Sequence, residues 1–394
     1  MDWTAFAFKY TLGKNFSEQL ISIDGYRRAV ERIVIPNAWK TKLNRLNRIR
    51  AIHGTTAIEG NLMSENQVRD FLEGASSASD SDKTLSMDQL QVQNAKRAQE
   101  WIRERSQSRH GTALRLEDLL HLHKLVTEGE RILENVPGKL RTRSVIVGSE
   151  ELGGVHRGAP HDQLPNLLKG FLEWLYSRKA HNELHPVERA LLAHFFLVTI
   201  HPFRDGNGRV SRLIEAYLLL IGGYNIHGFY GLSNFFYKNA NRYKMLLQHS
   251  RKSIPFDLTE FVEFGLGGFE DELKGINSFI QGRQNRLTYM DTLSRCHATK
   301  RSARRYVLSD REYTFLTQFV DKTNPIDPFA LDVENRMSLS KVLSDPAFQF
   351  IYRGVSPRTF LRDIEKLRDK RFVKLQQENN ETYVSIDLGA IEQY

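Results

Sequence analysis

The 394-residue sequence contains a single cysteine, Cys296. One thiol cannot form an internal disulfide, a cysteine-based zinc cluster or a dithiol redox pair. Long apolar runs are also missing, because the stretches near 190–200 and 213–222 are too short to span a membrane and residues 1–16 hold none of signal-peptide length. The sequence therefore predicts a cytoplasmic protein that does not bind membranes.

Composition and net charge indicate the class of protein and the kind of partner it could bind. Hydrophobic residues make up 40% of the chain and charged residues 26%, which is typical of a globular protein long enough for two or three domains. The formal net charge of +9 and the pI near 9.4 permit an anionic partner. They do not distinguish a nucleotide from a nucleic acid.

Changes of pattern along the chain predict a mainly α protein in four parts. We expect an N-terminal helical region at 1–110, with a polar loop at 73–86, and a longer helical block at 111–275. In that block a β-branched run, a Gly-Gly pair and a second short apolar piece predict a small hairpin between residues 144 and 156. A helical linker at 276–305 precedes the last part, 306–394.

The last part has its own pattern of helices and strands. Ser356 is a good N-cap, Pro357 suits the first helical position, and apolar residues from Phe360 to Leu367 fall on one helical face. The following "FVKLQQENNETYVSI" predicts two strands around a turn. Three helices followed by a hairpin predict a winged-helix domain.

The stretch "TIHPFRDGNGRVSRL", residues 199–213, places charged residues and glycines between two apolar helical segments. Gly206 and Gly208 let the backbone turn and expose amide N–H groups where the second helix begins. Arg209 and Arg212 lie three residues apart and so share one helix face. Amide groups at a helix N-terminus together with two guanidinium groups suit a polyphosphate.

Two further side chains give this loop chemistry. Asp205 would repel a bare phosphate but would hold a Mg²⁺ ion bridging phosphate oxygens. His201 could take a proton from an attacking hydroxyl, while Phe203 anchors the loop in the core. Taken singly, each residue also has a structural explanation as a helix cap or an ion-pair partner. Taken together and in this order, the residues of the loop favour a functional site, because so many polar groups between two buried helices would lower the stability of the fold.

The segment "HPFRDGNGRVSR" resembles the defining motif of the Fic (filamentation induced by cAMP) family, and the resemblance extends over about residues 112–250. It implies a helical core that transfers AMP from ATP to a hydroxyl side chain of a target protein. It also implies a role for each matching residue: general base for His201, Mg²⁺ ligand for Asp205, phosphate cradle for Gly206, Asn207 and Gly208, and phosphate clamps for Arg209 and Arg212.

Three further features follow from the same resemblance. The hairpin would be a flap that aligns the target segment by strand addition. Gly208, where phosphate-transferring relatives tend to carry lysine, favours AMP transfer. Family members often have two adjacent aromatic residues on the adenine side, whereas here Tyr243 is followed by Lys244, which leaves Tyr243 as the predicted ATP contact.

A second stretch, "HGTTAIEGN" at 53–61, resembles the inhibitory motif of the same family through Thr55, Glu59 and Gly60. An ordinary helix end would also explain a Glu-Gly pair. The functional interpretation is that Glu59 pairs with Arg212, so that the arginine cannot hold a γ-phosphate. The sequence therefore predicts an autoinhibited enzyme.

The partners expected are ATP and a target protein, while self-modification and a homodimer stay open. An alternative function is a DNA-binding regulator, because Arg358, Arg362 and Lys366 form a basic stripe on the presumed recognition helix. Residues 301–394 hold 15 basic and 14 acidic residues, a net of only +1, and Asp363 is among the acids that would balance the stripe. This favours a protein-docking or oligomerisation module. A further alternative is an enzyme that also removes AMP.

Overall fold

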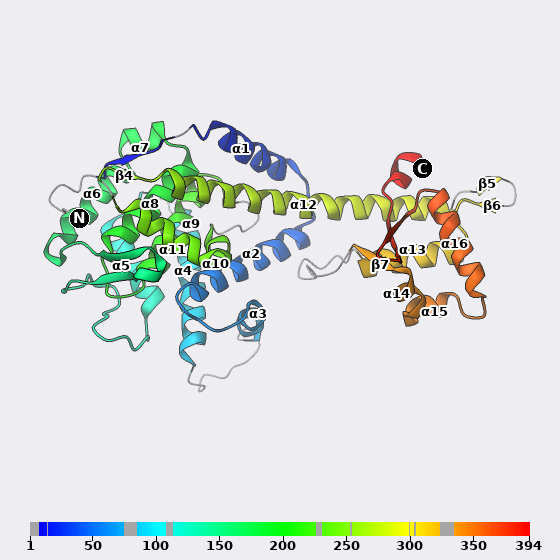
Figure 1. Cartoon of the computed structure of the whole chain (residues 1–394), viewed down its shortest axis with the longest axis horizontal. Coiled ribbons are helices and arrows are strands. Elements are labelled where there is room, and N and C mark those ends of the chain that lie inside the picture. The colour runs from blue at the N-terminus through cyan, green and yellow to red at the C-terminus, as the bar shows by residue number, and fades with distance from the viewer. Residues whose placement is uncertain are drawn as a thin grey trace. The chain divides into compact units, whose positions relative to one another are not determined.

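The computed structural model describes residues 8–13, 15–74, 85–107, 113–225, 231–252, 254–298, 300–302, 305–323 and 335–394. This part of the chain is mainly helical, as predicted (Figure 1). It divides into two compact units, Met1–Gly275 and Ile276–Tyr394. The regions predicted as 1–110 and 111–275 lie together in the first unit, and the four-part division stays a prediction. Most of the loop expected at 73–86 lies outside the described residues.

The first unit contains most of the helices. Its elements are β1 (Tyr10–Thr11), α1 (Ser17–Arg32), α2 (Asn37–Ala57), α3 (Glu65–Gly74), α4 (Met87–Ser106), α5 (Leu116–Thr127), β2 (Ile146–Ser149), β3 (Gly154–Arg157), α6 (Leu164–Leu175), α7 (Arg178–Glu183), α8 (Pro186–Ile200), α9 (Asn207–Ile221), α10 (Ser233–Lys238), α11 (Ala240–Ser250) and β4 (Phe256–Asp257). Helix α12 (Thr259–Ala298) begins in this unit and ends in the second.

Helices α8 and α9 form the centre of the first unit and pack against each other (Figure 1). Every residue of α8 from Val187 to Ile200 is buried, and so are most residues of α9. The start of α8 is fixed by Pro186 at the first helical position and by the side chain of His185, which accepts a hydrogen bond from the Val187 N–H. The polar loop between these two helices therefore has both ends held in the core.

Helix α2 packs against α10, α4 and α9. Its contact with α10 is close at Gly54, where an added β-carbon would lie 2.6 Å from the carbonyl oxygen of Ser233. Because no side chain fits there, the glycine sets the distance between the two helices. This contact positions the C-terminal end of α2, which carries the Thr55–Gly60 segment.

The predicted hairpin is present as the antiparallel pair β2–β3, with Val147 opposite His156. It covers residues 146–157, one or two residues later than expected. His156 is buried beneath it, whereas Ile146 and Val155 remain 66% and 57% exposed. One face of the hairpin is therefore anchored on the unit and the other is open to a partner.

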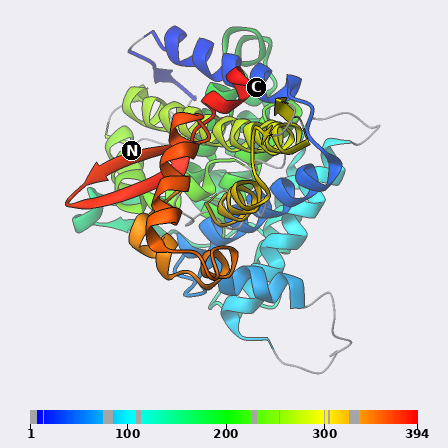
Figure 2. The same cartoon turned by 90° about the vertical axis from the view of Figure 1, so that its right-hand side faces the viewer.

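The second unit continues from α12 with β5 (Lys300–Ser302), β6 (Arg305–Tyr306), α13 (Asp310–Thr323), β7 (Arg336–Ser338), α14 (Leu339–Ser344), α15 (Pro346–Ile351), α16 (Pro357–Asp369), β8 (Val373–Glu378), β9 (Glu381–Ile386) and α17 (Gly389–Gln393). Strands β7, β9 and β8 form one sheet in that order, and Figure 2 shows the β8–β9 hairpin beside α16. The expected hairpin and the Ser356 cap of α16 are confirmed. The assignment as a winged helix stays a prediction.

The environment of Asp363 differs from the solvated helix face that its sequence position suggests. Asp363, weighed above as a balance for the basic stripe, is buried and binds Arg311 at 2.7 Å. Cys296 is also buried, in the hydrophobic core. In the described ranges, no helix has both the length and the apolar character needed to cross a membrane.

Candidate active site

The loop between α8 and α9 is closed by its own residues. His201 ends α8 in a left-handed conformation with φ of 54°, and Gly206 precedes α9 with φ of 77°. The side chain of Asn207 brackets the loop, because Oδ1 accepts the N–H of Phe203 and Nδ2 donates to its carbonyl, each at 2.9 Å. With its side chain engaged in this way, Asn207 offers a phosphate only its backbone N–H, at the start of α9.

Residues outside the motif hold this loop in place. Arg141 donates from Nε to the carbonyl oxygen of His201 at 2.8 Å. The ring of His123 stacks on Phe203 with centroids 3.9 Å apart, and its Nε2 lies 3.1 Å from the carbonyl oxygen of Asp205. Neither Arg141 nor His123 was singled out from the sequence, because neither stands in a periodic pattern or in the motif.

His201 is prepared to accept a proton. Its Nδ1 lies 3.2 Å from the carbonyl oxygen of Val198, which can only accept, so Nδ1 carries the proton and Nε2 has a free lone pair. Burial lowers the pKa of His201 to about 4, and the charges of Arg251 and Arg141 act in the same direction. The imidazole is therefore neutral at pH 7.

A cavity of about 380 Å³ adjoins this histidine. It is lined by five of the predicted site residues, namely Glu59, His201, Gly208, Arg212 and Tyr243. Residues 147–149 of the hairpin form another part of its wall, and Lys244 and Arg251 of the α11 region add positive charge. The inhibitory segment, the loop, the hairpin and α11 thus meet at one place.

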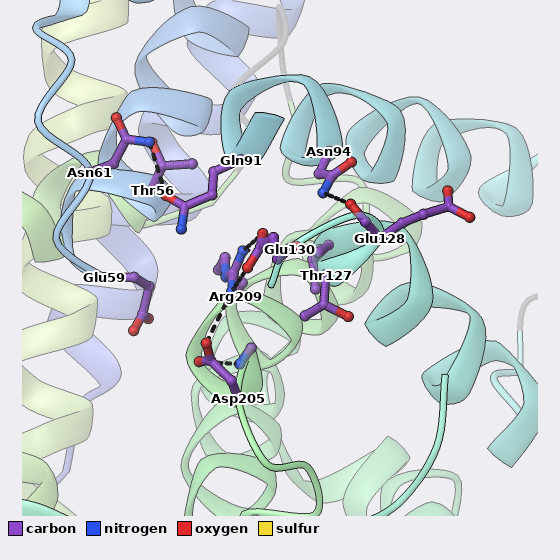
Figure 3. A network of polar contacts seen from close by, with 12 residues as sticks. Thr56, Glu59, Asn61, Gln91, Asn94, Thr127, Glu128, Glu130, Asp205 and Arg209 are labelled. Atoms are coloured by element: carbon purple, nitrogen blue, oxygen red, sulfur yellow. Dashed lines mark hydrogen bonds and ion pairs between the residues drawn. The ribbon is translucent and has the colours of Figure 1, made fainter. Parts of the chain in front are cut away.

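Arg209 does not line this cavity. Its side chain is 2% exposed, donates to the carbonyl oxygen of Val126 at 2.7 Å and pairs with Glu130, with 3.0 Å between Nη2 and Oε2 (Figure 3). The predicted phosphate clamp is thus an ion pair with a buried carboxylate in this arrangement. Glu130 escaped the sequence analysis, since an isolated glutamate after a helix carries no distinguishing pattern.

Asp205 has the exposure that a metal ligand needs, with 40% of its side chain accessible. Its Oδ1 accepts the N–H of Gly206 at 2.6 Å, and its Oδ2 lies 3.7 Å from Arg209 (Figure 3). Among the residues that the structure describes, no cluster of three metal-binding side chains exists. One accessible carboxylate fits Mg²⁺ only where phosphate oxygens and water supply its other ligands.

The predicted pairing of Glu59 with Arg212 is present. Nη2 of Arg212 lies 2.6 Å from Oε1 of Glu59, while Nε donates to the Thr55 hydroxyl at 2.9 Å and Nη2 to the Thr55 carbonyl at 3.0 Å. Burial acts to raise the pKa of Glu59, but the charge and hydrogen bond of Arg212 outweigh it and the pKa lies below its ordinary value. Glu59 is therefore ionised at neutral pH.

Gly208 leaves room for this carboxylate. An added β-carbon there would overlap Oε1 of Glu59 and would lie 3.0 Å from Nη1 of Arg212. The carboxylate thus occupies space directly against the first turn of α9, where the phosphate cradle was predicted.

Tyr243 is buried and lines the same cavity as Arg212. Its hydroxyl lies 2.9 Å from Nε2 of His194, and its ring stacks on Phe236 with centroids 4.6 Å apart. The neighbouring Lys244 reaches the carbonyl oxygen of Ile58 at 3.5 Å.

Part of the chain is similar to known proteins. Residues 113–219 match the model of the Fic/DOC family. The chain is 35% identical over 212 residues to the protein adenylyltransferase Fic of Drosophila grimshawi, and equally to that of Drosophila virilis. Each match covers 52% of this chain and 40% of the relative, so the chain spans less than half the length of these curated relatives.

Solved structures resemble the fold. A Fic family protein from Desulfovibrio desulfuricans aligns with a TM-score of 0.53 at 20% identity, covering 95% of this chain and 98% of the other. Residues 134–508 of Fic-1 from C. elegans align with a TM-score of 0.52 at 22% identity, covering 67% and 72%. Residues 113–219 thus match the Fic/DOC family model, and the chain shares a mainly helical fold with these structures.

Proposed function

We propose that this protein transfers AMP from ATP to a hydroxyl side chain of a target protein and that Glu59 inhibits the reaction. The observation that carries the proposal is the neutral His201, whose free Nε2 adjoins a cavity that also contains Arg212 and the glycine at the start of α9. The similarity to protein adenylyltransferases supports the choice of AMP as the transferred group.

The transfer would be an in-line displacement at the α-phosphorus. The hydroxyl oxygen of the target forms a bond to that phosphorus, the bond to the β-phosphate oxygen breaks, and pyrophosphate leaves. Nε2 of His201 takes the hydroxyl proton. A bound triphosphate would raise the pKa of His201, because its negative charge favours the imidazolium and offsets the effects of Arg141 and Arg251.

The start of α9 would bind the phosphates. The N–H groups of Asn207, Gly208 and Arg209 lie in the first turn, ahead of the first intrahelical bond, which Val210 donates to the Gly206 carbonyl. Asp205 would hold a Mg²⁺ ion, which supplies neutralising charge for the leaving pyrophosphate. Glu130 leaves Arg209 little free charge, so Arg212 would be the principal clamp.

The open hairpin β2–β3 would align the target. A segment in extended conformation could pair with a strand edge, and the exposed Ile146 and Val155 would contact its side chains. This would bring a target hydroxyl towards the cavity wall formed by residues 147–149.

Two parallel incubations test the reaction. The protein is incubated with Mg²⁺ and either α-labelled or γ-labelled ATP, alone and with a cell extract. We expect protein-bound label only from α-labelled ATP and labelled pyrophosphate from γ-labelled ATP. Protein labelled from γ-labelled ATP alone would identify phosphate transfer instead.

A further inference from the structure

Glu215 is a fully buried carboxylate on α9, less than one turn beyond Arg212. It does not line the cavity. Its Oε2 lies 2.5 Å from Nδ1 of His194, and its Oε1 accepts the N–H of Leu232 at 2.9 Å. A buried charge is costly unless it is paired and hydrogen-bonded, and here both carboxylate oxygens are used.

The contacts of Glu215 continue in a directed chain toward the cavity. Nε2 of His194 lies 2.9 Å from the hydroxyl of Tyr243. Tyr243 and Arg212 line the same cavity, where burial raises the pKa of Tyr243 and the charge and hydrogen bond of Arg212 act to lower it. A guanidinium can only donate, so the Tyr243 oxygen accepts from Arg212. Its own proton then goes to Nε2 of His194, and Nδ1–H of His194 goes to Glu215. Every proton in the chain has an acceptor in this assignment.

Arg212 is therefore held from two sides. Thr55 and Glu59 bind it from α2 and the turn after it. On its other side Arg212 meets Tyr243, whose hydroxyl is in turn held by His194 and Glu215. Under the proposed function the contact with Glu59 must break before a phosphate binds. His194 and Glu215, which support Tyr243, do not line the cavity and need not move when a phosphate binds.

We propose that Glu215, acting through His194 and Tyr243, is a positioning residue that keeps the Arg212 guanidinium directed into the cavity after Glu59 withdraws. This rests on the proposed function, in which Arg212 holds a phosphate of ATP. Glu215 supplies the negative charge at the end of the chain, His194 transmits its orientation, and Tyr243 fixes the guanidinium. A freely rotating guanidinium would lose entropy on binding phosphate, and the chain removes that cost.

The test uses the full-length protein with Glu59→Gly, in which inhibition does not mask the effect. Glu215→Gln keeps the shape of the side chain and removes the charge. Tyr243→Phe keeps the stacking on Phe236 and removes the hydroxyl. Tyr176→Phe is the matched control, since its hydroxyl accepts a hydrogen bond from the Leu114 N–H at 2.7 Å elsewhere in the same unit.

Three quantities are measured for each variant: the KM and kcat of α-label incorporation, and the Kd of ATP by calorimetry. A charge-assisted hydrogen bond is lost, so we expect Glu215→Gln and Tyr243→Phe each to raise KM and Kd about tenfold. We expect kcat to change much less, because the lost contact serves bound substrate and transition state alike. The double variant should be no worse than either single variant, since both interrupt one chain.

The outcomes separate this inference from the proposed function. If the Glu59→Gly parent binds ATP but transfers no label, the proposed function fails. The Kd of ATP still tests the role of the hydrogen-bonded series from Glu215 to Tyr243. A Kd within twofold of the parent in Tyr243→Phe would overturn the chain even if Glu215→Gln does not fold. An equal rise in Tyr176→Phe would likewise overturn it, because the effect would then be a general loss of packing.

Discussion

At the scale of single residues, His201 shows how local geometry selects a role. The residue ends a buried helix, its Nδ1 is committed to Val198, and its carbonyl oxygen accepts from Arg141. Only Nε2 is left for proton transfer. The backbone contacts therefore settle which nitrogen can act before any substrate is present.

Replacing His201 tests this assignment directly. His201→Ala removes the proton acceptor, and we expect the rate of α-label incorporation to fall by about 10²–10⁴-fold. The dissociation constant of ATP, measured by calorimetry, should stay within a few-fold of wild type. An equal loss of ATP binding would give His201 a structural role instead.

Glu59 predicts a gain of activity. Glu59→Gly frees the Arg212 guanidinium, and the charge-assisted pair is worth about 1.5–3 kcal/mol. We therefore expect initial rates of α-label incorporation to rise roughly tenfold to a hundredfold. Adding Arg212→Ala should abolish the gain, since no clamp is left to release. A folded Glu59→Gly protein with unchanged activity would reduce residues 55–60 to an ordinary helix end.

The sequence reveals some of these residues and hides others for a physical reason. His201, Asp205 and Arg212 stand in one short loop motif, so their types and spacing are visible together. The contacts of Glu130 with Arg209 and of His123 with Asp205 join segments about 80 residues apart. Such contacts depend on tertiary packing, which no local pattern encodes.

At the scale of secondary-structure elements, the position of the inhibitory segment depends on how α2 packs on α10. The helices, the β2–β3 hairpin and the β8–β9 hairpin were predictable, because apolar periodicity and turn residues are local properties. The close approach of α2 to α10 was not, since Gly54 looks unremarkable within its helix. Only the neighbouring backbone shows why a side chain is excluded there.

A larger side chain at Gly54 should weaken the packing of α2 against α10. In Gly54→Ala the new β-carbon would meet the Ser233 carbonyl oxygen, so α2 must move away from α10 and carry Glu59 with it. We expect a lower Tm together with faster AMP transfer. Gly25→Ala in α1 is the matched control, because its β-carbon would meet nothing within 4 Å. It should gain about 0.5–1 kcal/mol of stability and leave activity unchanged. Gly54→Ala with wild-type rates would contradict the coupling.

At the scale of the whole molecule, buried histidines should make the first unit sensitive to acid. Burial lowers the pKa of His123 to about 4 and that of His156 to about 3. Both are depressed below the unfolded value near 6.5, so the unfolded chain takes up protons first. The contribution of these two histidines to the free energy of unfolding is therefore fully present above pH 6.5, and it is lost as the pH falls from there toward 3.

Unfolding in urea at pH 7.5 and pH 5 measures this loss. The tryptophans at positions 39, 101 and 174 lie in the first unit, and the second unit contains none, so tryptophan fluorescence reports on the first unit. His156→Gln retains an N–H donor for the Thr199 carbonyl oxygen. We expect its loss of stability between the two pH values to be smaller than that of wild type by about 2 kcal/mol. Identical losses would mean that His156 does not titrate differently on unfolding.

The second unit carries the remaining alternative, binding of DNA. Arg358 and Arg362 are exposed on α16, whereas Lys366 of the same stripe lies 3.6 Å from the buried carboxylate of Asp363. The net charge of +1 over residues 301–394 still predicts weak binding. We expect fluorescence anisotropy to show no binding of a random duplex at physiological salt. Tight binding that is lost in Arg358→Ala/Arg362→Ala would instead favour the DNA-binding alternative.

A β-carbon at position 208 would overlap the carboxylate of Glu59, which lies against the turn that the proposed function assigns to phosphate. The Glu59 carboxylate and the triphosphate of ATP would then occupy overlapping positions, so Glu59 would act as a competitive inhibitor that is tethered to the enzyme. The tether sets a constant effective concentration, whereas the concentration of ATP varies. Inhibition of this kind weakens as ATP accumulates, so the turn after α2 would convert the nucleotide supply of the cell into a level of protein modification.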